Sequence, residues 1–260
     1  MTPHIIEIGP LQLALCLGFV LLAGVTSFVQ KLGLGRDLAV GTVRTFAQLF
    51  LMGYVLKFVF EVRVSWLVLL LYAFMVAAAV HIIRSRVKER TVQFVVPTFL
   101  SMLVSYSLVT MVVTGVIVDA RPWWTPQYFI PLAGMIVGNS MTAISICLDR
   151  LFSDLRARRG EVEMKLALGA DFREASREIM AGAIRAGMIP SINSLMAVGL
   201  VSLPGMMTGQ ILSGTDPLIA IRYQIVVMLM LVASTALGAL IVTNLVRKRC
   251  FSKGQQLLLR

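Results

Sequence analysis

The segment Val64–Ile83 reads VSWLVLLLYAFMVAAAVHII and contains no Asp, Glu, Lys or Arg. A helix needs about 20 mostly apolar residues to cross the roughly 30 Å hydrocarbon core of a bilayer, and this segment is long enough to do so. Of the 260 residues in the chain, 58% are hydrophobic and only 14% are charged. The mean hydropathy is +0.85, well outside the composition of soluble globular proteins. The sequence therefore indicates an integral membrane protein of the all-α class.

Other apolar runs of similar length precede and follow this segment, so we predict a polytopic protein with about seven transmembrane helices. The predicted spans are Leu11–Val29, Leu38–Phe60, Val64–Ile83, Phe94–Val118, Tyr128–Leu148, Ala183–Leu203 and Ile225–Val246. We expect the first to be a retained span and not a signal peptide, because no basic residue precedes it. Residues 1–260 are predicted to form a single transmembrane domain.

The distribution of basic residues predicts the orientation. The chain has 24 Lys and Arg against 13 Asp and Glu, and most of the basic residues fall on one side of the predicted spans. The other side carries only Lys57, Arg63, Arg121 and Arg222. By the positive-inside rule the richer side is cytoplasmic, which predicts an external N-terminus and a cytoplasmic C-terminus. The net charge of +11 is thus explained by topology and by contact with anionic lipid, and no nucleic-acid partner is expected.

Residues 149–183 form the one polar segment long enough to dock a partner, on the predicted cytoplasmic side. Glu161–Leu168 (EVEMKLAL) consists of good helix formers, and Gly169 follows where a helix C-terminus favours positive φ. Asp171–Glu174 (DFRE) has the pattern of a capping box, which starts a second helix. We therefore predict a helix, a tight turn and a second helix.

This segment resembles the conserved cytoplasmic loop of ATP-binding cassette permeases. The pattern of that loop is Glu-Ala-Ala, three residues, Gly, nine residues, Ile, one residue and Leu-Pro. Glu163, Gly169 and Ile179 match it, whereas Met164–Lys165 and Ala181–Gly182 depart from it. The resemblance implies a loop that couples the membrane subunit to an ATPase; the alternative is an ordinary solvated loop. The residues expected to carry this coupling are Glu163, Gly169, Ala170, Asp171 and Ile179.

A second resemblance covers nearly the whole chain. Gln48–Phe60 (QLFLMGYVLKFVF), Ile130–Met141 (IPLAGMIVGNSM) and Val198–Val227 (VGLVSLPGMMTGQILSGTDPLIAIRYQIVV) are similar to the Fet B family of bacterial iron-export permeases and to the related plant aluminium-tolerance permeases. The resemblance implies a permease domain in the bacterial cytoplasmic (inner) membrane, exporting iron or another metal. Substrates attributed to the family also leave open an organic or nucleotide-sugar substrate.

The chain has no GxxxxGK[ST] motif to bind ATP phosphates. ATP and magnesium are therefore expected on a separate ATPase partner, and no cofactor is expected on this chain. Two membrane halves are needed, which predicts a homodimer. Gly134 and Gly138 have the GxxxG spacing that allows close helix approach, either at a dimer seam or within one subunit.

Polar residues inside the predicted spans are candidates for a substrate path. Arg44 lies inside the second span with Gln48 one turn later, where it either lines a path or extends to the membrane interface. The fifth and sixth spans each carry neighbouring amide and hydroxyl groups, which either line a path or bond helices together. The predicted path residues are Arg44, Gln48, Asn139, Ser140, Asn193 and Ser194.

The stretch after the sixth predicted span combines proline and glycine, which disfavours a regular helix. We predict a broken or re-entrant gate made of Pro204, Gly205, Met206, Met207 and Gly209. Iron and aluminium prefer harder ligands than methionine sulfur, and no metal site can be assigned from the sequence. A stand-alone secondary transporter is a further alternative, although the predicted spans contain acidic residues only near their ends.

Overall fold

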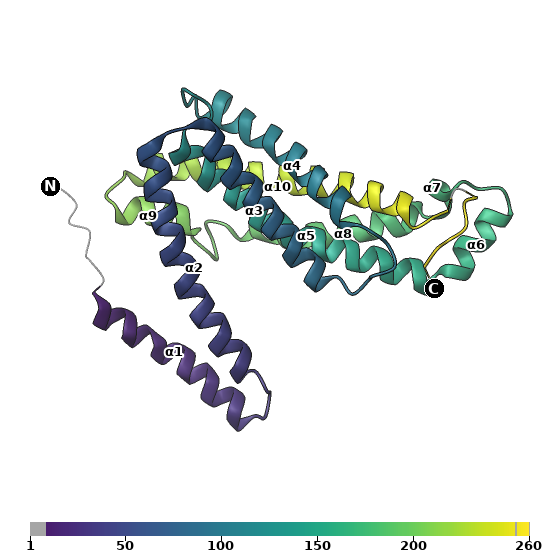
Figure 1. The fold of residues 1–260 in the computed structure, drawn as a ribbon, viewed down its shortest axis with the longest axis horizontal. Coiled ribbons are helices and arrows are strands. Elements are labelled where there is room, and N and C mark those ends of the chain that lie inside the picture. The colour runs from purple at the N-terminus through teal and green to yellow at the C-terminus, as the bar shows by residue number, and fades with distance from the viewer. Residues whose placement is uncertain (1–8, 253, 260) are drawn as a thin grey trace. The chain divides into compact units, whose positions relative to one another are not determined.

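The computed structural model describes residues 9–252 and 254–259, and most of them are helical (Figure 1). These residues contain two isolated β-bridges and no strand. The elements are α1 Pro10–Val29, α2 Gly35–Val62, α3 Ser65–Arg86, α4 Val95–Val112, the π-helical continuation η1 Val113–Ile117, α5 Pro126–Ala157, α6 Arg159–Ala167, α7 Phe172–Ala175, α8 Arg177–Ala197, α9 Gly205–Leu212 and α10 Pro217–Arg249. The predicted all-α class is confirmed.

Within the described residues, six helices are long and apolar enough to cross a membrane. They are Pro10–Val29, Gly35–Val62, Ser65–Arg86, Val95–Ile117, Pro126–Ala157 and Pro217–Arg249. Each contains, or largely coincides with, one of the predicted spans.

The predicted span Ala183–Leu203 differs from what the structure contains. Helix α8 covers Arg177–Ala197, and its polar side chains, including Arg185 and Asn193, leave it outside the set of sufficiently apolar helices. The helix stops at Ala197 because the chain then turns, with Gly199 at a φ of +83°. The prediction of a continuous helix to Leu203 is therefore wrong.

The contacts divide the chain into two compact units, and the first consists of residues up to Arg63 with Leu212–Gly214. Helices α1 and α2 form a hairpin in this unit. The hydroxyl of Ser27, which is buried, accepts a 3.0 Å hydrogen bond from the backbone N–H of Leu34 and so fixes the turn between the two helices.

The second unit, Val64–Ile211 with Thr215–Arg260, is built around α5. Helices α3, α8 and α10 all pack against α5, and α4 packs against α10 (Figure 1). Ile136 and Leu148 of α5 are fully buried in this bundle. The phenol of Tyr72 on α3 donates a 3.1 Å hydrogen bond to the carbonyl of Leu103 on α4. A helix buried on so many sides can present polar groups to several neighbours.

The GxxxG pair on α5 has two different surroundings. A Cβ added at Gly134 would lie 2.9 Å from Cε of Met75 on α3, whereas one added at Gly138 would meet no atom within 4 Å. Gly134 therefore allows close packing within the subunit. A dimer seam at Gly138 stays a prediction.

The predicted gate segment is more regular than its composition suggests. Gly205–Leu212 forms α9, and the N–H of Thr208 donates a 3.0 Å hydrogen bond to the carbonyl of Pro204. Proline is tolerated here because it precedes the first turn, where its missing N–H costs nothing. The non-helical stretch is Val198–Pro204 instead, so the prediction of broken backbone at Gly205, Met206, Met207 and Gly209 is wrong.

Candidate functional site

The segment 149–183, called the coupling segment below, folds as a helix, a turn and a further helix, as predicted. Its first residues still belong to α5, which extends to Ala157. Helix α6 ends at Ala167, and Gly169 has a φ of +95°. A Cβ at this position would meet no atom within 4 Å, so the backbone angle and not lack of space is what favours glycine.

The predicted capping box is present at the start of α7. The carboxylate of Asp171 accepts a 2.7 Å hydrogen bond from the N–H of Glu174, and the carboxylate of Glu174 accepts one of 3.2 Å from the N–H of Asp171. These bonds satisfy two N–H groups that would otherwise lack partners. Asp171 therefore has a clear structural role in shaping the turn.

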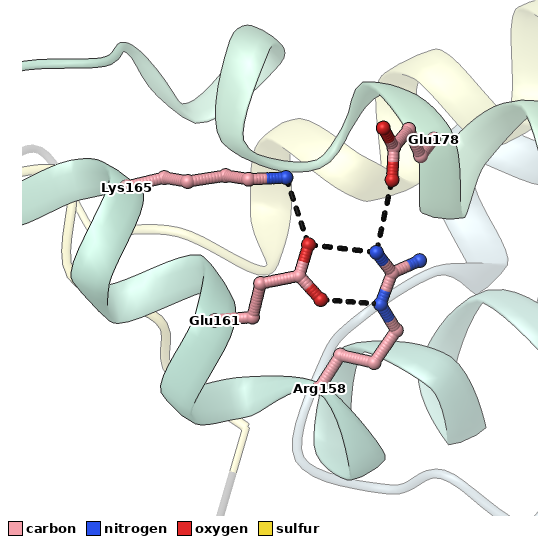
Figure 2. A network of polar contacts seen from close by, with 4 residues as sticks. All are labelled: Arg158, Glu161, Lys165 and Glu178. Carbon is pink, nitrogen blue, oxygen red and sulfur yellow. Dashed lines mark hydrogen bonds and ion pairs between the residues drawn. The ribbon is translucent and has the colours of Figure 1, made fainter.

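A network of ion pairs connects α6 to α8 (Figure 2). The guanidinium of Arg158 donates two 2.7 Å hydrogen bonds to the carboxylate of Glu161 and one of 2.9 Å to Glu178. Lys165 Nζ donates a 2.8 Å hydrogen bond to the same Glu161 carboxylate. The hydrogen bonds donated by Arg158, followed by the one donated by Lys165, lower the pKa of Glu161 to about 2, and the bonds that Glu161 and Glu178 accept from Arg158 raise the pKa of Arg158. Glu161 therefore stays ionised at neutral pH and holds the guanidinium of Arg158, which in turn joins the start of α6 to Glu178 of α8.

Two apolar side chains on α6 and at its end point into solvent. Met164 is 57% exposed and Leu168 is 81% exposed, and their spacing of four places them on the same side of a helix. An apolar pair on an otherwise charged helix is typical of a protein contact surface. This contact surface was not predicted from the sequence, where Met164 was only a departure from alanine; the spacing of Met164 and Leu168 within EVEMKLAL was the available signal.

The C-terminal tail packs against the coupling segment, a contact that was not predicted from the sequence. The rings of Phe172 and Phe251 have centroids 5.6 Å apart. Gln255 Oε1 accepts a 3.1 Å hydrogen bond from the N–H of Phe172, and Leu257 and Leu259 are buried. The apolar run after the polar residues 254–256 was the only sequence signal for this contact.

Between this tail and α6 lies a groove of about 700 Å³. Glu163, Gly169 and Ala170 line it together with residues 254–257. Glu163 is paired with Arg159 at 2.7 Å, and Ile179 is 2% exposed. The structure thus brings three of the five predicted coupling residues to one groove, while Asp171 caps a helix and Ile179 lies in the core.

A second polar site lies between α5, α8 and α10. The amide of Asn139 donates hydrogen bonds to Ser191 Oγ at 3.2 Å and to Thr235 Oγ1 at 3.1 Å. Ser140 Oγ lies 3.2 Å from the same Thr235 oxygen. Neither Ser191 nor Thr235 was among the predicted path residues.

Close packing of α8 on α5 makes this cluster possible. A Cβ at Gly187 would lie 2.6 Å from the carbonyl oxygen of Ala143 and would also overlap Cys147. Ser191 follows Gly187 by one helical turn, on the same side of α8. The absence of a side chain at Gly187 therefore lets the hydroxyl of Ser191 reach Asn139.

Beside the cluster is a cavity of about 280 Å³. Its lining consists of Asn139, Ser191, Ser194, Val198, Ser202, Leu203, Pro204, Met228, Leu231 and Val232. Among the predicted path and gate residues, Asn139, Ser194 and Pro204 line this cavity, whereas Ser140 is buried and does not line it. The cavity is lined by amide, hydroxyl and apolar groups, with no charged side chain.

The other predicted path and gate residues lie elsewhere. Asn193 is exposed outside the cavity lining, and Arg44 and Gln48 are exposed on α2 in the other unit. The gate residues carried by α9 do not line the cavity. Among the described residues, no three His, Cys, Asp or Glu side chains gather in a way that could hold a metal ion.

Comparison with known proteins shows the family. Residues 10–251 match the model of the uncharacterised protein family UPF0014. The UPF0014 membrane protein slr1647 of Synechocystis is 39% identical over 88% of each chain. The probable iron export permease protein FetB of Escherichia coli is 34% identical over 95% of this chain and 93% of its own. Protein ALUMINUM SENSITIVE 3 of Arabidopsis thaliana is 36% identical over 96% of this chain and 90% of its own.

No solved structure matches the chain. The expected resemblance to bacterial iron-export and plant aluminium-related proteins is confirmed by these relatives. The described residues contain six helices long and apolar enough to cross a membrane, and relatives of the chain are named as membrane proteins. The chain is therefore a multi-pass membrane protein that belongs to the UPF0014 family.

Proposed function

We propose that this chain is the membrane subunit of an ATP-driven exporter whose ATPase is a separate protein. The observation that carries the proposal is the coupling segment, in which a short helix presents Met164 and Leu168 and ends at a glycine turn. Ion pairs between α6 and α8 would let this segment move as one piece with the bundle. Such a segment suits transmission of movement from a docked ATPase to the spans.

The proposed cargo is iron or another metal, moved outward across the bacterial cytoplasmic membrane by two copies of this chain. The support is the similarity to the probable iron export permease protein FetB of Escherichia coli, which covers nearly the whole chain. The proposed orientation places the coupling segment and the C-terminus in the cytoplasm, where ATP and magnesium are available to the partner. In this arrangement the chain itself needs no cofactor.

A second candidate is a cargo held by hydrogen bonds, such as an organic solute or a metal carried as a complex. The observation in favour is the cavity lining, which offers neutral groups from Asn139, Ser191 and Ser194 and no carboxylate. A bare ferrous or ferric ion prefers charged oxygen or nitrogen donors. A stand-alone secondary transporter has less support, because the acidic residues of the candidate spans lie near helix ends.

The test is reconstitution of the chain with candidate ATPase subunits in vesicles, followed by measurement of solute accumulation and ATP hydrolysis. Iron that stimulates both would support the metal exporter, and stimulation by an organic solute alone would support the second candidate. Failure of every ATPase to bind would overturn the coupling proposal.

Two glycine variants, one in the turn after α6 and one within α6, test whether the turn itself couples ATP hydrolysis to transport. Gly169→Val should uncouple hydrolysis from transport, because a β-branched residue does not adopt a φ of +95° without strain. Gly160→Val is the matched control, since Gly160 lies in α6 with open space around it. Full transport by the Gly169→Val complex would contradict the proposed role of the turn.

A further inference from the structure

Basic residues in and near the coupling segment differ in whether they form ion pairs. Within the segment, Arg150, Arg158, Arg159 and Lys165 each form an ion pair with a carboxylate. A second group has no ion pair within residues 9–252 and 254–259: Arg84, Arg86, Lys88, Arg90, Lys248 and Arg249. All members of this second group are exposed. Their charges are therefore available to an anion from outside the chain.

The acidic residue nearest the group does not neutralise it. Glu89 lies between Lys88 and Arg90, but its carboxylate is buried and pairs with Arg156 of α5. Burial raises the pKa of Glu89, but the hydrogen bonds from Thr91 and the charge of Arg156 outweigh it and lower the pKa below its ordinary value. The Glu89 carboxylate thus binds Arg156 of α5 and forms no ion pair with the surrounding cations.

Two of the unpaired cations stand at the end of a groove of about 760 Å³ along α4 and α10. Its apolar wall includes Val96 and Leu100 from α4 and Leu245 from α10, which are 59%, 52% and 44% exposed. Lys248 and Arg249 line its basic end. The guanidinium of Arg249 is held in place by a 2.9 Å hydrogen bond to the carbonyl of Gln93.

We propose that this groove binds an anionic phospholipid, with the phosphate at Lys248 and Arg249 and an acyl chain along Leu100 and Leu245. Both helices are candidate membrane spans, and the basic residues occupy the ends where lipid head groups lie. The charge of the groove is complementary to such a head group. A free anion would satisfy the basic end but would leave the exposed apolar wall uncovered, so the lining fits a lipid better than a soluble phosphate.

Because of the position of the groove, a bound lipid would contact α7 and the C-terminal tail as well as the spans. Phe172 of α7 and Phe251 and Gln255 of the tail line the same groove, and these residues also join the tail to the coupling segment. A bound lipid would therefore touch the spans, the coupling segment and the tail together. Figure 1 shows the ends of α4, α7 and α10 at the same end of this unit.

The experiment measures lipid retained by the purified full-length protein by native mass spectrometry, with phosphatidylglycerol and phosphatidylcholine supplied at equal concentration. The wild-type protein should retain phosphatidylglycerol preferentially. Each Lys or Arg near the membrane surface strengthens attraction to anionic lipid about fivefold, so Lys248→Gln with Arg249→Gln should weaken phosphatidylglycerol retention by about 25-fold. Arg222→Gln is the matched control, because Arg222 is an exposed basic residue of α10 far from the groove lining.

A second pair of variants tests the apolar wall without changing charge. Leu100→Trp should fill the groove and lower phosphatidylglycerol retention, whereas Leu108→Trp should not, because Leu108 is 60% exposed on α4 but outside the lining. Equal retention of the two lipids by the wild-type protein would overturn the proposal. So would a loss in the Arg222→Gln or Leu108→Trp control as large as in the groove variants. This readout needs no ATPase, so it stands or falls separately from the proposed function.

Discussion

The amide of Asn139 on α5 donates a 3.1 Å hydrogen bond to Oγ1 of Thr235 on α10, 96 residues further along the chain. The same amide reaches Ser191 on α8. One side chain therefore joins three helices beside the cavity of about 280 Å³. Its removal should affect both the packing of the bundle and the lining of the cavity.

Asn139→Ala should lower the free energy of unfolding by about 1 kcal/mol, since each interhelical hydrogen bond in a membrane contributes about 0.6 kcal/mol on average. For a chain of this size that corresponds to a fall in Tm of about 2–4 °C, measurable by thermal unfolding in detergent. Transport in the reconstituted complex should fall as well. Asn193→Ala is the control, because Asn193 is exposed outside the cavity lining; equal effects of the two variants would contradict a special role for Asn139.

Acid should weaken the ion-pair network around Glu161. The pKa of this carboxyl is lowered from an ordinary value of 4.5 to about 2 by its hydrogen bonds to Arg158 and Lys165. Because the folded value is the lower one, the stabilisation is fully present above about pH 4.5 and is lost as the pH falls toward 2. Wild-type protein should therefore unfold at a higher temperature than Glu161→Gln at pH 6, and the difference should shrink between pH 4.5 and 2.

Arg158→Met removes the partner that lowers this pKa most. In this background the difference in unfolding temperature between Glu161 and Glu161→Gln should be smaller at pH 6, because only Lys165 is left to lower the pKa of the carboxyl below its ordinary value. A gap between wild type and Glu161→Gln that persists unchanged at the acid end would show that Glu161 acts through packing and not through charge.

The C-terminal tail offers two adjacent leucines with opposite surroundings. Leu257 is 6% exposed and Leu258 is 47% exposed. Leu257→Ala should destabilise the tail by about 2–3 kcal/mol through loss of buried apolar contact, whereas Leu258→Ala should change stability by no more than about 0.5 kcal/mol. Hydrogen exchange of residues 254–259 and of α7 should rise in the first variant and not in the second. Equal exchange in both would mean that the tail does not depend on its buried leucine.

Local signals in the sequence were sufficient for much of the fold. Apolar runs predicted the candidate spans, Asp171 and Glu174 predicted the capping box, and Gly169 predicted the turn, because each depends on neighbouring residues alone. Asp216, directly before Pro217, likewise caps α10 by accepting a hydrogen bond from the N–H of Leu218.

The candidate site was predicted only in part. Asn139 was identified as a polar group inside a span, but its partner Thr235 depends on which face of α10 packs against α5. Its partner Ser191 depends on the close approach allowed at Gly187. Neither follows from spacing along the chain. The tail was missed for a similar reason, since a single aromatic residue such as Phe251 becomes informative only when its packing partner, Phe172, is known.

The last prediction separates the surface of the coupling segment from its core. Leu168 is 81% exposed and Ile179 is 2% exposed, although both belong to the segment proposed to dock the ATPase. Leu168→Gln should change stability by no more than about 0.5 kcal/mol but weaken ATPase binding by about tenfold, because an exposed apolar side chain at the centre of a contact contributes mainly to binding. Ile179→Ala should show the reverse, losing about 2–4 kcal/mol of stability with a smaller effect on the affinity of the folded fraction. Unfolding in detergent and binding of the purified ATPase, measured on both variants, distinguish these outcomes. If Leu168→Gln bound the ATPase as tightly as wild type, the partner would have to contact another face of the segment, and the groove lined by Glu163 and Ala170 would be the next surface to test.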